Sequence, residues 1–278
     1  LVEAGLGAGD YAVLDRSFGG AFVYEAGGTT SNIDFAGNEN TFILDASSEF
    51  DFFGYSYDPD YTDDSEVVVL EGSVGSGIRS IEFGEATDGV EDWDVVSFGG
   101  LDTSVNLDLS AVDANYDATA TSDGQVVAYI DGAEGVFGTA HGDTITGDIG
   151  RNIIHGGDGT DYVSGGHGQD LVSGGAGADS VYGGTGEDIL IDIEGGDKIW
   201  GDGHETSGDT APKYDDTFVV GQGTTVMDFD LSPDGTGLSG RANQANDIVF
   251  VQVAAGSLAA AGYTLTQIYE LVSGTNDT

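Results

Sequence analysis

A nine-residue repeat between Gly138 and Trp200 constrains this chain more than any other feature. The seven blocks read GTAHGDTIT, GDIGRNIIH, GGDGTDYVS, GGHGQDLVS, GGAGADSVY, GGTGEDILI and DIEGGDKIW. A short fixed period predicts a solenoid, because each block is one structural unit that stacks on the next. The eighth position is always aliphatic, and the sixth is always acidic or its amide: Asp143, Asn152, Asp161, Asp170, Asp179, Asp188 and Asp197.

Each column of the repeat has a physical reason. Glycines at the first, second and fourth positions allow the positive backbone dihedrals of a tight turn and direct carbonyl oxygens toward one point. The aspartate adds a charged oxygen, so each turn offers the all-oxygen ligand set that Ca²⁺ prefers. The predicted calcium ligands are the seven sixth-position residues with the glycines of the central blocks: Gly156, Gly157, Gly159, Gly165, Gly166, Gly168, Gly174, Gly175, Gly177, Gly183, Gly184 and Gly186.

The spacing also sorts these ligands in space. The last three residues of a block form a short strand whose middle side chain points inward, so two blocks complete one turn of a flattened solenoid. Residues eighteen apart then stack about 4.8 Å from each other. One edge carries Asp143, Asp161, Asp179 and Asp197, and the other carries Asn152, Asp170 and Asp188. With one ion bridging each stacked pair, the repeats hold about five Ca²⁺ ions.

These blocks resemble the RTX repeats of proteins that Gram-negative bacteria secrete through the type I pathway. Segments on both sides extend the resemblance, such as Asp94-Val-Val-Ser-Phe before the repeats and the serralysin-type closing segments Asp216-Thr-Phe-Val-Val and Asn246-Asp-Ile-Val-Phe after them. The resemblance implies an all-β fold built around a right-handed parallel β-roll that folds on Ca²⁺. It also implies an extracellular location, either secreted or associated with the cell surface.

Four regions follow from this interpretation. Residues 1–91 form a β-rich N-terminal region, 92–137 lead into the roll, 138–203 are the roll, and 204–278 are a C-terminal cap with the secretion signal. The short β-branched runs of the first region predict either a β-sandwich or an irregular solenoid that extends the roll. A helical signal lies near the end, in 258–261 and 266–272. Because the chain begins at Leu1 instead of Met, we expect a processed or excised fragment.

Departures from the repeat mark its two ends. Thr139 and Asp148 replace second-position glycines, His141 replaces a fourth-position glycine, and Asn152 is a neutral amide. We therefore expect the first two loops to bind calcium more weakly. Asp192 and Ile193 replace the opening glycines of the last block, so Asp197 is expected either to hold its ion poorly or to act as an end cap.

The charge of the chain supports a role for calcium. Fifty acidic residues against six basic ones give a formal net charge of −44, and there is no cysteine. Stacked carboxylates oppose a compact state unless a cation relieves their repulsion, so calcium binding is expected to couple to folding. This charge makes nucleic acid and anionic membranes poor partners. No run of eighteen apolar residues predicts membrane insertion.

Three further groups of acids were considered as metal sites or solvated surface. The cluster at 58–66 and the cluster at 88–94 are each predicted to be either a second kind of calcium site or a solvated acidic loop. The members of these clusters are Asp58, Asp60, Asp63, Asp64 and Glu66, then Asp88, Glu91, Asp92 and Asp94. Asp209, Asp215 and Asp216 are predicted to be solvated.

The sequence does not predict an enzyme. None of the four histidines lies in a His-Glu-x-x-His zinc motif, and there is no Gly-x-Ser-x-Gly elbow or Gly-x-x-x-x-Gly-Lys loop. Two functions compete. The favoured one is a non-catalytic extracellular structural protein of the cell-surface, matrix or self-assembling type. The alternative is the C-terminal secretion and folding module of a larger secreted enzyme, a protease, lipase or mannuronan epimerase, whose catalytic domain lies upstream.

Outward positions of the roll offer two candidate contact surfaces. Ile153, Leu171 and Ile189 stack into an apolar stripe, which is either covered by a flanking segment or forms a homo-oligomer contact. On the opposite face, Tyr162, Tyr182 and Trp200 are candidates for stacking on a glycan, with a structural role as the alternative.

Overall fold

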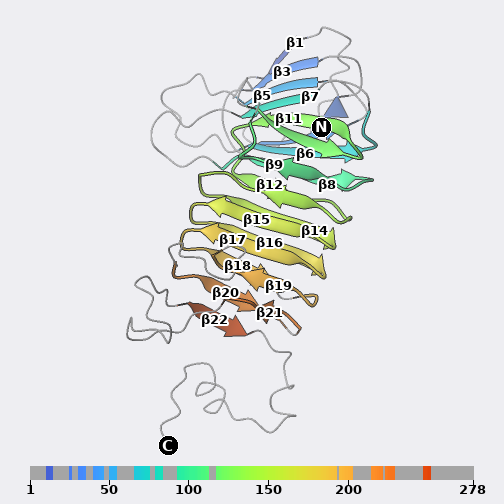
Figure 1. Ribbon diagram of the computed structural model, residues 1–278. Helices are drawn as coiled ribbons and strands as arrows, with labels where there is room; N and C mark the ends of the chain where they lie inside the picture. The colour runs from blue at the N-terminus through green and yellow to red at the C-terminus, as the bar shows by residue number, and fades with distance from the viewer. Residues whose placement is uncertain are drawn as a thin grey trace, which may run out of the picture.

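The structure is a computed structural model of the 278-residue chain. Its described residues form 22 strands and no helix, which confirms the all-β class. The strands stack into one elongated solenoid with two sheets (Figure 1). The described residues are 11–14, 25–26, 31–35, 40–46, 50–54, 66–75, 79–83, 93–112, 117–192, 194–202, 214–221, 223–228 and 247–251.

Successive strands alternate between the two sheets, except at β9 to β11. The first sheet has 12 strands, in the spatial order β1 (Tyr11–Leu14), β3 (Ser31–Phe35), β5 (Phe50–Gly54), β7 (Arg79–Phe83), β11 (Gln125–Asp131), β10 (Ala118–Ser122), β9 (Asn106–Asp108), β13 (Thr144–Thr146), β15 (Tyr162–His167), β17 (Ser180–Thr185), β19 (Lys198–Trp200) and β21 (Thr225–Val226). The second has 10, in the order β2 (Glu25–Ala26), β4 (Asn40–Asp45), β6 (Glu66–Gly72), β8 (Val95–Leu101), β12 (Gly135–Phe137), β14 (Ile153–Gly159), β16 (Leu171–Gly177), β18 (Ile189–Asp192), β20 (Thr217–Val220) and β22 (Ile248–Val251).

Strand pairing in the repeats confirms the predicted stacking. Ile153 pairs with Leu171 in the second sheet, and Thr144 pairs with Tyr162 in the first, both in parallel and eighteen residues apart. Two nine-residue blocks therefore make one coil, and the repeat forms a parallel β-roll.

The interior of the roll is a pair of aliphatic columns, one from each sheet. The eighth-position side chain of every block points inward and is buried, because alternate residues of a strand face opposite sides. The columns continue beyond the repeats through the same register. The first-sheet column is Leu107, Ile145, Val163, Val181 and Ile199, and the second is Val68, Val96, Val136, Ile154, Val172, Leu190 and Phe218.

An antiparallel insertion interrupts the solenoid just before the roll. β10 pairs antiparallel with both β9 and β11, which gives the first sheet its two additional strands. The turn between β10 and β11 is Asp123-Gly124, and both residues have positive φ, 50° and 76°. Asp-Gly is a favoured pair for such a two-residue hairpin turn. The sequence predicts strands in this region but not their antiparallel pairing.

The solenoid also extends on both sides of the roll. β6 pairs with β8 across the expected boundary at residues 91 and 92, so of the two architectures considered for the first region the described strands adopt the extending solenoid. β20 and β22 continue the second sheet after the repeats. The helical signal at 258–261 and 266–272 lies outside the described residues. Nowhere in the described part of the chain is a helix long and apolar enough to cross a bilayer.

Arg79 is the largest fully buried side chain of the described residues. It stands two residues before the inward Ile81, which is the place that the sixth-position acids hold in the roll. Its guanidinium donates to the backbone carbonyl oxygens of Val127, Val126 (2.7 Å), Ala46 (2.9 Å) and Gly75 (3.1 Å). A covalently attached cation therefore binds carbonyl oxygens of β11 together with those of Ala46 and Gly75.

We predict that Arg79→Met destabilises the protein by about 3 kcal/mol or more, because buried carbonyl groups lose their donors. Arg151→Met is the control, since Arg151 is exposed and its guanidinium carbon lies 4.9 Å from the centre of the Trp93 ring. That contact is worth at most about 1 kcal/mol. Urea unfolding in saturating calcium measures both, and equal losses would contradict the role given to Arg79.

Candidate metal sites

The two edges of the solenoid carry the predicted ligands as two files of side chains. On the first edge, where the chain passes from the second sheet to the first, the amide of Asp143 donates to Oδ1 of Asp161 (2.7 Å). Asp161 donates in the same way to Asp179, and Asp179 to Asp197, each at 2.8 Å. We call this series the first-edge file. The structure thus stacks these four residues as their spacing predicts.

The opposite edge repeats this arrangement in a second-edge file. The amide of Asn152 donates to Oδ1 of Asp170 (2.8 Å), and that of Asp170 to Oδ1 of Asp188 (2.9 Å). The file then continues past the repeats, because Asp188 donates to Asp216 (2.9 Å) and Asp216 to Asp247 (3.1 Å).

Asp216 was predicted to be solvated, and this prediction is wrong. The residue is 1% exposed, whereas its neighbour Asp215 is exposed. Asp216-Thr-Phe has the same pattern as positions six to eight of a block: an acid, a spacer and an inward apolar residue. The segment between the repeats and Asp216 is longer than in the repeats, so the nine-residue period does not predict this acid. The same triplet begins at Asp94 and Glu134 upstream, where the amide of Asp94 donates to Oε2 of Glu134 (2.9 Å).

Six aspartates of the two files each leave one carboxylate oxygen without a partner among the described residues. Oδ1 of these residues accepts an amide, but Oδ2 is buried and has no hydrogen-bond partner among the described residues. A buried anionic oxygen in this state costs several kcal/mol, and an oxygen-seeking cation removes that cost. The residues present therefore fit Ca²⁺. The oxygens concerned belong to Asp161, Asp170, Asp179, Asp188, Asp197 and Asp216.

The glycines leave room for these carboxylates. A Cβ atom on Gly156 would lie 2.7 Å from Oδ2 of Asp161, and one on Gly174 would lie 2.6 Å from Oδ2 of Asp179. Gly165 and Gly183 stand in the same way against Asp170 and Asp188. The prediction of positive φ is confirmed at the second and fourth positions, for Gly157, Gly159, Gly166, Gly168, Gly175, Gly177, Gly184 and Gly186. It is wrong at the first position, where Gly156, Gly165, Gly174 and Gly183 do not have positive φ.

Burial shifts the acidity of the file residues. It raises the pKa of Asp161 and Asp170 to about 7, that of Asp188 to about 6 and that of Asp216 to about 9. Neighbouring carboxylates add to the rise, as Asp179 and Asp143 do for Asp161. A bound cation acts in the opposite direction, because it favours the charged form.

The first two loops differ from the others in a way that matches the weaker binding expected of them. Oδ1 of Asp143 accepts from the Val105 amide (2.6 Å) and the Thr139 hydroxyl (3.0 Å), and Oδ2 accepts from the Thr139 amide (2.5 Å). Oδ1 of Asn152 accepts from the Asp148 amide (2.9 Å). Protein groups thus already occupy the oxygens that a cation would bind.

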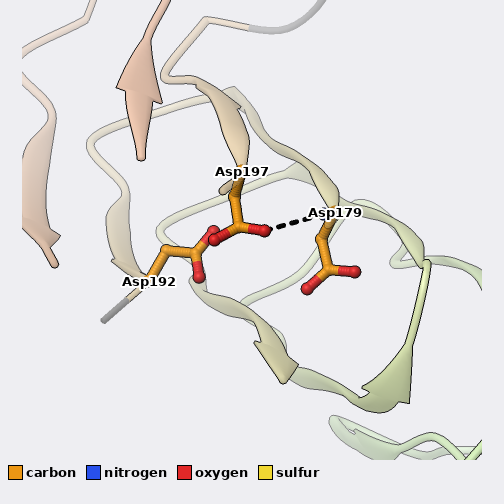
Figure 2. A group of neighbouring side chains, drawn as sticks. All are labelled: Asp179, Asp192 and Asp197. Carbon is orange, nitrogen blue, oxygen red and sulfur yellow. Dashed lines mark hydrogen bonds between the residues drawn. The ribbon is translucent and has the colours of Figure 1, made fainter. Parts of the chain in front are cut away.

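The last loop contains an acid that the sequence analysis did not include among the ligands. Ligand oxygens of Asp179, Asp192 and Asp197 all lie within 4.8 Å of one another (Figure 2), and all three residues are buried. Burial and the nearby carboxylate of Asp197 raise the pKa of Asp192 to about 8.

Comparison with known proteins identifies the roll. Residues 137–172 and 168–191 match the RTX calcium-binding nonapeptide repeat, in four copies. The roll is an RTX calcium-binding β-roll. The RTX match ends with the sixth block, at Ile191. Of the sixth-position residues of the repeats, it includes all but Asp197. No curated protein matches the chain.

The remaining candidates fall in different places. Glu66 is buried and donates its amide to Oδ1 of Asp94 (2.7 Å), so these two members of the acidic clusters belong to the second edge.

Tyr182 is buried and stacks on Trp200, with ring centres 4.5 Å apart, which favours a structural role for that pair over glycan stacking. Outside the described residues lie Asp58, Asp60, Asp63, Asp64, Asp88, Glu91, Asp92 and Asp209.

Asp216→Asn should raise the calcium concentration needed for folding at least about tenfold, because it removes one ligand charge while keeping an amide oxygen. Asp215→Asn removes the same charge from an exposed neighbour and should leave that concentration unchanged. A calcium titration followed by circular dichroism gives both midpoints. Coinciding midpoints would show that Asp216 is not a ligand.

The raised pKa values also predict how the calcium-free roll responds to pH. The ordinary pKa of these groups is 3.8, so between about pH 4 and pH 7 the folded roll binds more protons than the unfolded chain. Stability without calcium should therefore fall as the pH rises through this range, and calcium affinity should rise. Thermal unfolding in chelator from pH 5 to pH 8 tests this.

Asp170→Asn should reduce the slope of stability against pH, and the exposed Asp123→Asn should not. A slope that is the same in both variants would exclude the file carboxylates as its origin.

Proposed function

We propose that this chain is a non-catalytic extracellular structural protein whose β-roll folds on Ca²⁺ after type I secretion. The observation that carries the proposal is the pair of files of buried carboxylate oxygens that lack a partner among the described residues. RTX repeat proteins are typically exported by type I systems. The absence of cysteine is compatible with a secreted protein in which bound calcium replaces disulfide staples.

The thin core of the roll supports coupling between calcium and folding. Each nine-residue block buries one aliphatic side chain in the interior columns, against the ordering of nine residues of backbone. The same block also buries a charged group, which opposes folding unless it is compensated. Calcium compensates that charge, so the free energy of calcium binding becomes free energy of folding.

Removing calcium with a chelator should convert much of the roll to disordered chain, and returning calcium should restore it. Magnesium at the same concentration is the control. It should restore much less, because Mg²⁺ demands a tighter octahedral site and dehydrates reluctantly. Circular dichroism records the β signal at each step. A β signal that is unchanged after thorough removal of calcium would refute the proposed function.

The outer face of the second sheet supports a structural role through self-assembly. Ile153 and Leu171 are half-buried and Ile189 is 45% exposed, so this apolar stripe is open to solvent among the described residues. Its register continues through Thr217 to Ile248, which is 52% exposed. Exposed apolar surface of this kind supports a contact with another chain.

A groove of about 420 Å³ follows the stripe. Trp93 and Arg151 line it toward β14, while Glu187 and Asp215 line it toward β20. Two copies packed stripe to stripe in opposite directions would bring the basic end of one groove to the acidic end of the other. This complementarity favours a second copy of the chain as the occupant.

Leu171→Glu should leave calcium-dependent folding intact and abolish assembly, because an unpaired charge in an apolar contact costs several kcal/mol. Thr144→Glu is the matched control, at the seventh position of a block on the opposite sheet, where the side chain is exposed. Sedimentation in calcium and circular dichroism of the same samples measure the two effects.

If the wild type sediments as a monomer in calcium, the self-assembling role is wrong. The secretion and folding module of a larger enzyme then becomes the better proposal. If Leu171→Glu unfolds the calcium-loaded monomer, the stripe is an internal packing surface.

A further inference from the structure

Asp192 breaks the rule of the repeat at its first position. Glycine occupies this place in the four central blocks, at Gly156, Gly165, Gly174 and Gly183. The Asp192 side chain therefore extends into the space beside the sixth-position acid that those glycines leave open. It is 1% exposed, and neither of its carboxylate oxygens has a hydrogen-bond partner within the described part of the chain.

Two other carboxylates meet Asp192 in this turn. The amide of Asp179 donates to Oδ1 of Asp197 (2.8 Å), as elsewhere in the first-edge file. Oδ2 of Asp179 and Oδ2 of Asp197 are both buried and have no partner among the described residues. Figure 2 shows the carboxylate groups of Asp192 and Asp197 side by side, with that of Asp179 next to them. One carboxylate oxygen from each of the three side chains thus lies within 4.8 Å of the other two.

The position of this cluster explains why a third carboxylate is needed there. Within the file, each turn lies beside the aspartate of its own block and that of the next coil. After Asp197 the next coil offers Thr224 instead, since Lys198 pairs with Thr225. The Thr224 hydroxyl donates to the carbonyl oxygen of Asp192 (3.1 Å), so it brings no negative charge. Asp192 supplies from within the turn the carboxylate that the next coil lacks.

We propose that Asp179, Asp192 and Asp197 form a three-carboxylate cation site that closes the first-edge file, distinct from the glycine-turn sites of the roll. It binds Ca²⁺ more tightly than those sites do, because affinity rises with the number of charged ligands. It also favours a trivalent lanthanide, whose charge matches the three carboxylates. This inference rests on the proposed calcium-dependent roll, and it reverses the expectation that Asp197 holds its ion poorly.

Titrations of the full chain with Ca²⁺ and with Tb³⁺ test the site. Asp192→Asn should weaken the tightest site at least about tenfold and leave the other sites unchanged. Asp192→Gly restores the residue of the central blocks and should do the same, so it decides the question if the asparagine variant does not fold. Asp158→Asn removes one carboxylate from an exposed position of the roll and should leave the tightest site unchanged.

Equal affinity of the tightest site in the wild type and the Asp192 variants would overturn the proposal and leave the proposed function standing. A wild type that binds no ion would overturn both. Anomalous diffraction from wild-type crystals grown with Tb³⁺ provides a test without a variant. A peak between the three carboxylates supports the site, whereas two carboxyl groups that share a proton with no ion between them would overturn it.

Discussion

The structure depends on how it compensates charge that is stacked and buried along the edges of a solenoid. Each coil of the roll places a carboxylate directly above the next, and Oδ1 of each is held by a backbone amide of the neighbouring coil. This hydrogen bond fixes the register, but it also fixes the negative charges in a row. Because the aliphatic columns between the sheets are thin, the proposed function makes the fold of the roll depend on a cation bound at Oδ2.

In the first sheet, one place holds a cation upstream of the hairpin and acids at the equivalent positions of the roll. Upstream, Arg79 supplies a permanent positive charge to carbonyl oxygens of β11, Ala46 and Gly75, and aromatic side chains such as Phe83 and Phe98 enlarge the core. On the proposed function, the acids of the roll take their cation from solution. The chain would then join a part whose cation is covalent to a part whose cation is exchangeable, with the β10 and β11 hairpin close to the junction.

The repeat predicts the roll because its period encodes local geometry. Turn glycines, the sixth-position acid and the inward aliphatic residue act within nine residues, so their stacking follows from spacing, as the pairing of Ile153 with Leu171 confirms. Asp216 was missed because a longer connection separates it from the repeat, although its triplet is the same. The roles of Arg79 and Asp192 depend on groups brought together only by folding. The antiparallel pairing of β10 had a local signal, Asp123-Gly124, but its neighbours in the sheet are set by the solenoid.

Hydrogen exchange of the backbone amides, with calcium and with chelator, tests the central claim most directly, because it reports each coil separately. We expect amides of β13 to β19 to be protected in calcium and to exchange rapidly in chelator. Amides of β7, β10 and β11 should stay protected in both, since Arg79 and the larger core hold them. Undiminished protection of the roll in chelator would contradict the claim that the buried carboxylate files need a cation.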